Sequence, residues 1–162
     1  NAIGIDTESG TSITNANSIN VFGSSGTGIS SGNVNNVINS GTITLSHATS
    51  TGNVGIQAIN GSSIENTNTG VINISGYEGK AINTTGTVGT VTNKGKINVT
   101  TVNVGNYDGT TSGIGINVAD TTTLNNTGNI TIESQEGVAI NSTSSAQKIN
   151  ITNSNNDTAI LK

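Results

Sequence analysis

The sequence of 162 residues contains no cysteine, proline, methionine, tryptophan or arginine. Without cysteine, the chain has neither a disulfide framework nor a thiolate metal site. Only 9% of its residues are charged and 30% are hydrophobic, whereas ordinary globular domains hold about 25% and about 45–50%, respectively. This composition excludes an ordinary globular enzyme.

The low hydrophobicity does not indicate a disordered chain. Disordered sequences combine it with high net charge and abundant proline, but the formal net charge here is −4 and proline is absent. Isoleucine and valine favour strands, while asparagine and glycine tolerate tight turns. The composition therefore predicts many short strands joined by turns. No stretch approaches the roughly 18 apolar residues of a membrane-spanning helix, and no export signal follows Asn1.

Two short phrases recur along the whole chain. The first reads ITNANSINV from Ile13, VINSGTITL from Val37, VTNKGKINV from Val91 and LNNTGNITI from Leu124, with a stretched copy from Ile64 and a degraded copy from Ile151. The second is a small residue followed by an isoleucine, at Ile5, Ile29, Ile56, Ile82, Ile116 and Ile140. Neighbouring copies of either phrase lie 24 to 34 residues apart. A random low-complexity segment would not repeat two separate sequence motifs with the same period.

This period predicts the architecture. A repeat near 25 residues that holds three short strands is one coil of a parallel β-helix, in which coils stack about 4.8 Å apart. We therefore expect an all-β fold, a parallel β-helix (β-solenoid) of about six coils of roughly 24–34 residues. A leucine-rich repeat needs several leucines per repeat, and the chain has only three. The usual crossover rule favours the right-handed form.

Alternation of apolar residues places individual side chains inside the coil. In the fourth coil, we expect Ile82 to point inward on the first strand, Val88 and Val91 on the second, and Ile97 on the third. Asn93 follows Val91 by two residues, so it shares the inward side. A buried amide is stable only when it is hydrogen-bonded.

The repeated asparagines can satisfy one another on successive coils. We therefore predict an asparagine ladder formed by Asn15, Asn39, Asn66, Asn93, Asn126 and Asn153. We expect the glycines that follow it, Gly41, Gly70, Gly95 and Gly128, to supply the turn geometry. A ligand-binding role for the repeated asparagine is the alternative interpretation.

The repeat is irregular in one place, the turn after the third strand. The interval from the first isoleucine of that strand to the next small-isoleucine phrase is 10 residues in regular coils, 13 from Ile43 to Ile56, and 19 from Ile97 to Ile116. Insertions in a solenoid often form its binding face. We call this turn the variable corner.

The variable corner gathers the residue types that recognise partners. The candidate partner-binding residues are Phe22, His47, Tyr77, Glu78, Tyr107 and Asp108, and Glu133 and Glu136 lie in the same turn. Tyrosine beside carboxylates is common where a protein or a sugar is recognised. The alternative is that large and charged side chains do not fit inside a narrow solenoid and collect at its widest turn.

Side chains suited to catalysis or metal binding are scarce. The chain has a single histidine, and its acidic pairs, such as Asp6 and Glu8, have no basic residue beside them. We therefore expect no enzymatic activity, no cofactor and no metal site. An acidic chain with five lysines and no arginine also disfavours nucleic acid as a partner.

The repeat and composition resemble the β-helical passenger domains of bacterial autotransporter adhesins, a type V secreted family. Phrases such as VTNKGKINV and LNNTGNITI, with GIGINVA and GVAINST between them, carry the resemblance over essentially the whole chain. It implies a rod at the bacterial cell surface, exported through the outer membrane or secreted, that attaches to a host-cell or bacterial surface protein or glycan. We expect residues 1–162 to be one solenoid segment inside a much longer protein, joined to the membrane only through a C-terminal translocator.

Three other functions remain open at this point. A structural spacer would raise a distal binding domain and bind nothing itself. A polysaccharide-active β-helix enzyme would need clustered catalytic groups. An ice-binding solenoid would need a regular outward Thr-x-Thr array, but Thr42-Ile43-Thr44 has no counterpart in the first or fourth coil.

Overall fold

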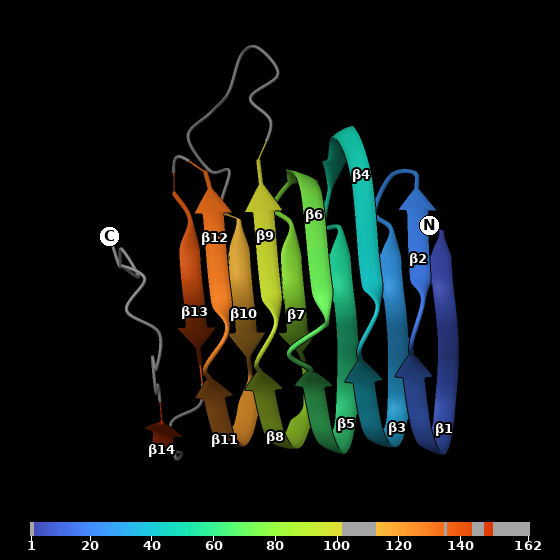
Figure 1. The fold of residues 1–162 in the computed structure, drawn as a ribbon, viewed down its shortest axis with the longest axis vertical. Coiled ribbons are helices and arrows are strands. Elements are labelled where there is room, and N and C mark those ends of the chain that lie inside the picture. Colours follow the sequence, from blue (N-terminus) through green and yellow to red (C-terminus); the bar gives the residue numbers. More distant parts are fainter. Residues whose placement is uncertain (1, 102–112, 135, 144–147, 151–162) are drawn as a thin grey trace.

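The fold consists of stacked parallel strands. The structure, a computed structural model, describes residues 2–101, 113–134, 136–143 and 148–150. Within these ranges every regular element is a strand, and each paired strand runs parallel to its neighbour (Figure 1). The described residues contain no helix with the length and apolarity that crossing a membrane requires. The predicted all-β parallel solenoid is confirmed.

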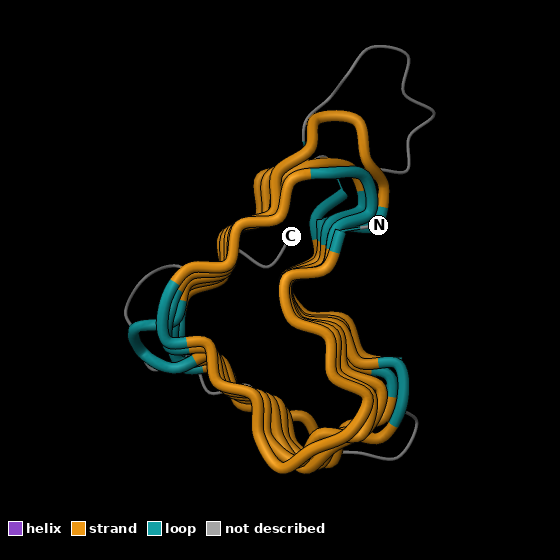
Figure 2. The backbone as a smooth tube through the Cα atoms, turned by 90° about the vertical axis from the view of Figure 1, so that its right-hand side faces the viewer, coloured by secondary structure: helices purple, strands orange, loops and turns teal. Residues whose placement is uncertain are grey.

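The strands form two sheets that wrap one core. They are β1 (Ile3–Asn15), β2 (Ser18–Phe22), β3 (Thr27–Asn39), β4 (Thr42–Thr51), β5 (Val54–Asn66), β6 (Val71–Tyr77), β7 (Lys80–Thr84), β8 (Thr87–Asn93), β9 (Lys96–Thr100), β10 (Ile114–Val118), β11 (Asp120–Asn126), β12 (Asn129–Glu133), β13 (Val138–Ser142) and β14 (Lys148–Asn150). The smaller sheet has the order β12-β9-β6-β4-β2, and the other nine strands form the larger sheet. Figure 2 looks along the stack and shows the coils superposed, with their turns at shared corners.

The strands of five coils lie within the described residues, and those of a sixth are described in part. Four full turns separate β2 from β12 in the smaller sheet, and β13 begins a further coil. The expected count was about six coils. Much of the final coil falls in residues 144–147 and 151–162, which lie outside the described residues.

The expected three strands per coil occur only from the fourth coil onward. In the first three coils, the first and second strands are one continuous strand of 13 residues. The fourth coil has one extra residue here, because two residues lie between Ala58 and Gly61, whereas three lie between their partners Thr84 and Val88. The extra residue interrupts the ladder and separates β7 from β8.

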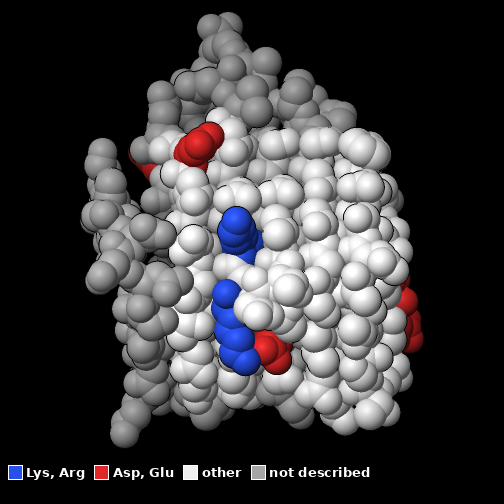
Figure 3. Space-filling model, in the orientation of Figure 1, with Lys and Arg blue, Asp and Glu red and all other residues white. Residues whose placement is uncertain are grey.

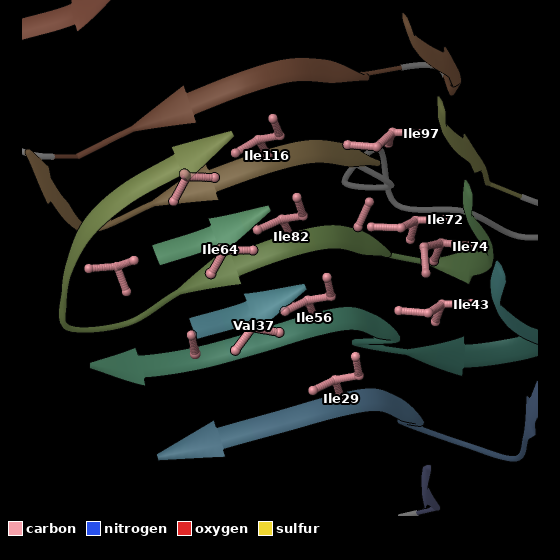
Figure 4. Close-up of a cluster of buried hydrophobic side chains, with 14 of the residues drawn as sticks. Ile29, Val37, Ile43, Ile56, Ile64, Ile72, Ile74, Ile82, Ile97 and Ile116 are labelled. Atoms are coloured by element: carbon pink, nitrogen blue, oxygen red, sulfur yellow. The ribbon is translucent and has the colours of Figure 1, made fainter. Parts of the chain in front are cut away.

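The core is built from columns of aliphatic side chains. Ile29, Ile56, Ile82 and Ile116 are partners in successive coils and are all fully buried (Figure 4). Ile43, Ile72 and Ile97 form a second fully buried column from the smaller sheet. Val88 and Val91 are also buried. The inward positions predicted for the fourth coil are therefore confirmed.

The asparagine ladder is present. The Nδ2 group of each asparagine donates to Oδ1 of the next, from Asn15 to Asn39, Asn66 and Asn93 at 2.8 Å each and from Asn93 to Asn126 at 2.7 Å. All five side chains are buried. Asn153, the sixth predicted member, lies outside the described residues. The ladder satisfies the buried amides across coils that are 24 to 33 residues apart in sequence.

The glycines after the ladder have a different role from the one expected. Gly41, Gly70, Gly95 and Gly128 are not among the residues with positive φ. A Cβ on any of them would overlap a backbone oxygen of the preceding coil, such as Asn17 O beside Gly41. Glycine is therefore needed for the close approach of backbones and not for an unusual turn conformation.

Close packing also explains the small residue before each core isoleucine. A Cβ on Gly28 would lie 2.5 Å from Cγ2 of Ile43 across the core and 2.6 Å from the backbone oxygen of Gly55. We expect Gly28→Ala to lower the free energy of unfolding by about 1–3 kcal/mol. At Gly10 an added Cβ would meet only Thr7 Cγ2, at 3.8 Å. Gly10→Ala is therefore the matched control, and equal urea midpoints for the two variants would contradict this packing.

Candidate functional site

The variable corner begins where each strand of the smaller sheet ends. It comprises residues 22–26, 46–53, 77–79, 101–113 and 133–137, which connect one coil to the first strand of the next. Strands β2, β4, β6, β9 and β12 all point toward it (Figure 1). The solenoid thus places the described parts of these turns above one another on a single edge of the rod.

The insertion in the second coil remains part of a strand. Ser46 of β4 pairs with Ser75 of β6, and Thr51 pairs with Tyr77, so four residues of β4 lie between these pairs where β6 has one. The three extra residues form an irregularity between Ser46 and Thr51. This number equals the excess of the 13-residue interval over the regular 10. We expected a turn here, and the structure shows a bulged strand extension instead.

Two of the candidate residues are placed on one edge of the corner. The Phe22 side chain is 72% exposed, whereas its neighbour Val21 is buried in the core. Tyr77 ends β6 and is half-buried. They lie two coils apart, and Tyr77 stands two residues beyond Ser75, which occupies the register position of Phe22. This edge therefore presents aromatic surface from two separate coils.

Glu78 is held in a strained backbone conformation. It is exposed, and its φ is 49°. Ser25, at the equivalent position of the first coil, has a φ of 53°, and Gly52 in the second coil has a φ of 79°. A left-handed conformation costs a residue other than glycine about 1–2 kcal/mol. The corner therefore keeps a charged side chain at a position that glycine would occupy without strain.

The other candidates are not placed by the structure. His47 lies within β4, but its side chain is not among those described. Tyr107 and Asp108 lie outside the described residues. The two additional acidic residues of the corner, Glu133 and Glu136, are exposed. Of the six candidates, only Phe22, Tyr77 and Glu78 thus have a described side-chain environment.

The sequence analysis missed Asn53, the side chain that holds the corner together. Asn53 is buried, its Oδ1 accepts a hydrogen bond from the N–H of Gly26 at 2.9 Å, and its Nδ2 donates to the carbonyl oxygen of Ser75 at 2.9 Å. It thereby joins the first and third coils across the second. Other coils have glycine at this position, for example Gly79, where a Cβ would lie 2.5 Å from Ile74. The asparagine occurs in the coil that carries the three extra residues, a coincidence that is visible in the sequence.

Removing the Asn53 amide is expected to loosen the corner. In Asn53→Ala, the Gly26 N–H and the Ser75 carbonyl lose their partner, and an unsatisfied buried polar group costs about 1–3 kcal/mol. Asn53→Asp keeps the acceptor for Gly26 but loses the donor for Ser75. We expect Asn53→Ala to lower the urea midpoint and to speed amide exchange at Gly26, while Asn53→Asp protects Gly26. Unchanged exchange at Gly26 in Asn53→Ala would contradict this role.

Charged side chains contribute little to the described surface. The face in Figure 3 carries a few lysines and acidic residues on a surface that is otherwise uncharged. The ion pair between Lys94 Nζ and Glu65 Oε1, at 2.7 Å, is largely exposed, and such pairs add little stability. No group of three or more metal-ligating side chains occurs among the described residues. The surface is therefore mainly uncharged and polar.

Stacked amides also line the outer surface of the first strands. Asn83 Nδ2 donates to Gln57 Oε1 at 2.6 Å, Asn117 Nδ2 donates to Asn83 Oδ1 at 2.6 Å, and Asn141 Nδ2 donates to Asn117 Oδ1 at 2.7 Å. This outer ladder was not predicted. It runs beside the buried isoleucine column and fixes the same register from outside.

Comparison with known proteins supports the architecture. A family model described as the BigA fourth domain matches residues 1–104. No curated protein and no solved structure matches the chain. The family match and the stacked parallel strands together fit a β-helical domain of a bacterial surface protein.

Proposed function

The chain belongs to the BigA fourth-domain family, and from this premise we propose that it is an adhesin segment, which attaches its bacterium to host cells or neighbouring bacteria. The partner in this proposal is a surface protein or a glycan. The autotransporter route of export, through the outer membrane, is part of the same proposal and rests on the resemblance of the repeat. Nucleic acid is not a partner in this proposal, because the chain is acidic, with five lysines and no arginine.

The observation that carries the proposal is the composition of the variable corner. Phe22 and Tyr77 offer aromatic area from two coils, and Glu78 adds a carboxylate beside them. Exposed aromatic side chains are enriched where proteins bind partners. The positive φ of Glu78 supports a function as well, because backbone strain at residues other than glycine clusters at functional sites.

A non-binding spacer is the second candidate function, and one observation favours it. The core columns and the asparagine ladder continue without interruption through the described coils. Such a continuous rod is suited to hold a distal domain away from the cell surface. The two candidates differ in whether the folded chain binds cells by itself.

Binding by the folded chain tests the proposal. The purified chain is labelled and titrated onto intact epithelial cells and onto bacterial cells, and we expect saturable binding. In the double variant Phe22→Ala/Tyr77→Ala we expect the apparent Kd to rise at least about tenfold, because a few aromatic residues carry most of the energy of an interface. Replacing residues 102–112 by a short Gly/Ser turn tests Tyr107 and Asp108 in the same assay.

The control variant is Thr11→Ala/Thr14→Ala, which removes two exposed side chains of β1 away from the corner. We expect it to bind as the natural chain does, with an unchanged circular dichroism spectrum. If no chain binds either cell type, the segment is a spacer. If the natural chain and both corner variants bind equally, the contact lies elsewhere on the rod.

We further propose that the chain has no catalytic activity. An enzyme needs convergent titratable groups, and the acidic residues of the described corner are divided between Glu78 in the third coil and Glu133 and Glu136 in the fifth. Incubation with a panel of polysaccharides is expected to release no reducing sugar. Release of reducing sugar above a heat-denatured control would favour the polysaccharide-active alternative.

A further inference from the structure

The first coil has an open side. Strand β1 pairs only with β3, and β2 pairs only with β4, among the described residues. By contrast, β3 and β4 have a parallel partner on both sides. We call the free edges of β1 and β2 the N-terminal face, which forms one end of the stack in Figure 1. A free strand edge offers a row of backbone hydrogen-bonding groups to another strand.

The core columns are exposed at the N-terminal face. Ile5 and Ile19 are only partly buried, whereas their column partners in the next coil, Ile29 and Ile43, are completely buried. The outer residue Ile3 is also 46% exposed. Burying apolar surface stabilises a complex by about 25 cal/mol for each Å² that is removed from water. The face therefore favours an occupant whose apolar residues lie above the same columns.

The asparagine ladder leaves a hydrogen-bond acceptor, and not a donor, at the N-terminal face. Every ladder amide donates toward the higher-numbered coil. Asn15 is the first member, so its Oδ1 has no ladder amide donating to it and accepts instead from the backbone N–H of Asn17, at 3.3 Å. The interior oxygens accept at 2.7–2.8 Å. The face thus presents a buried acceptor that suits a stronger donor.

From these three features we propose that the N-terminal face is a docking surface for one more β-solenoid coil. This coil runs in the same direction as the coils described here and places an asparagine above Asn15. A neighbouring segment of the same surface protein supplies it, in keeping with a family whose description numbers this domain as the fourth. The proposal is independent of the adhesive function of the corner.

A second copy of the chain fits this face poorly. Two copies joined face to face would oppose two Asn15 oxygens, both acceptors, and would bring together the exposed carboxylates of Asp6 and Glu8 from each copy. Like charges on opposed strands destabilise a sheet. The sedimentation measurement described below distinguishes a head-to-tail copy from a preceding coil of the same protein. The free acceptor of Asn15 and the carboxylates of Asp6 and Glu8 favour a coil that brings a donor amide to this face.

A tandem duplication tests the proposal in the full chain. Residues 3–26 are duplicated directly before Ile3, which adds one coil of 24 residues, the spacing that separates the first two ladder asparagines. The added coil thereby places a copy of Asn15 above the original. We expect one cooperative unfolding transition at a higher temperature than for the natural chain. We also expect the free-edge amides of the original β1 and β2 to exchange with deuterium at least about tenfold more slowly.

The matched control carries Asn15→Asp in the added coil alone. Aspartate has no N–H to donate and would set a carboxylate against the oxygen of the original Asn15. We expect this control to lose the protection of the original β1. Equal protection in both extended chains would overturn the role of the ladder, and no gain in either would overturn the docking surface.

Measurements on the natural chain decide the matter if an extended chain fails to fold. We expect a monomer in sedimentation equilibrium whose β1 free-edge amides exchange much faster than those of β3. A dimer with protected β1 amides would make a second copy the occupant and would overturn the proposal. Equal protection of β1 and β3 in a monomer would also overturn it, because the face would then be covered already.

Discussion

The Ile97→Asp variant is expected to unfold the solenoid. Ile97 is fully buried between Ile72 and Ile130 in the smaller sheet, so aspartate there would bury a carboxylate without a partner. The loss is at least about 4 kcal/mol, at the upper end of single-residue effects. Domains of this size are stable by only about 5–15 kcal/mol. We therefore expect loss of the β-rich circular dichroism spectrum at neutral pH.

The control for this substitution lies one residue and one coil away. Thr131 pairs with Asn98, the residue after Ile97, and its side chain is exposed. Thr131→Asp introduces the same charge on the outside and is expected to shift the urea midpoint by no more than about 0.5 kcal/mol in equivalent free energy. A folded Ile97→Asp chain with native-like stability would show that Ile97 faces outward and that the inferred register is wrong.

The second large effect is expected at the centre of the asparagine ladder. Asn66 accepts from Asn39 and donates to Asn93, both at 2.8 Å, and it is fully buried. Asn66→Asp keeps the acceptor but turns the donor into a second oxygen that faces Asn93 Oδ1. Breaking a buried polar pair while burying a charge costs about 3–5 kcal/mol. We expect the urea midpoint at pH 7 to fall accordingly.

The loss in Asn66→Asp is expected to depend on pH. Burial without a counter-charge raises the pKa of the new aspartate in the folded state above its value in the unfolded chain. The folded state therefore binds the proton more tightly, so the variant is most stable at low pH and loses stability as the pH rises through about 4 and above. The protonated acid also regains a donor. The midpoint difference from the natural chain is expected to shrink between pH 7 and pH 3.

The control for the ladder variant is Asn60→Asp. Asn60 is exposed, its Oδ1 accepts from the backbone N–H of Thr87, and its Nδ2 donates to Asn33 Oδ1 at 3.2 Å. The control therefore loses an amide–amide bond that water can replace. We expect this variant to change stability little at either pH. A ladder variant that behaves like Asn60→Asp, with the same midpoint at pH 7, would contradict a buried ladder.

The periodic parts of the structure were predictable from the sequence, because each coil repeats the same physical requirements. Ile82, Val91 and Ile97 alternate with polar residues, and alternation alone decides which side chains face the core. The inward Asn93 needed a hydrogen-bonding partner, and the same residue type one coil away was the available partner. Repetition thus turned one local argument into a prediction for the entire stack.

The irregular parts were not predictable, because they depend on how neighbouring coils of unequal length fit together. The extra residue between Thr84 and Val88 splits a strand that is continuous in earlier coils. The bridging role of Asn53 occurs in the coil that carries the three extra residues and joins it to the coils on both sides. The variable corner was identified from sequence spacing, but only Phe22, Tyr77 and Glu78 can be compared with the structure. Their partner-binding role stays a prediction.

Exchange of side-chain amide protons is the most direct test of the account, because the ladder fixes the register of every coil. Nuclear magnetic resonance of the natural chain resolves the Nδ2 protons of asparagine residues. We expect those of Asn39, Asn66 and Asn93 to exchange with solvent slowly, with the stability of the whole fold, and those of the exposed Asn60 to exchange rapidly. Exchange of the three ladder amides as fast as that of Asn60 would contradict the stacked solenoid.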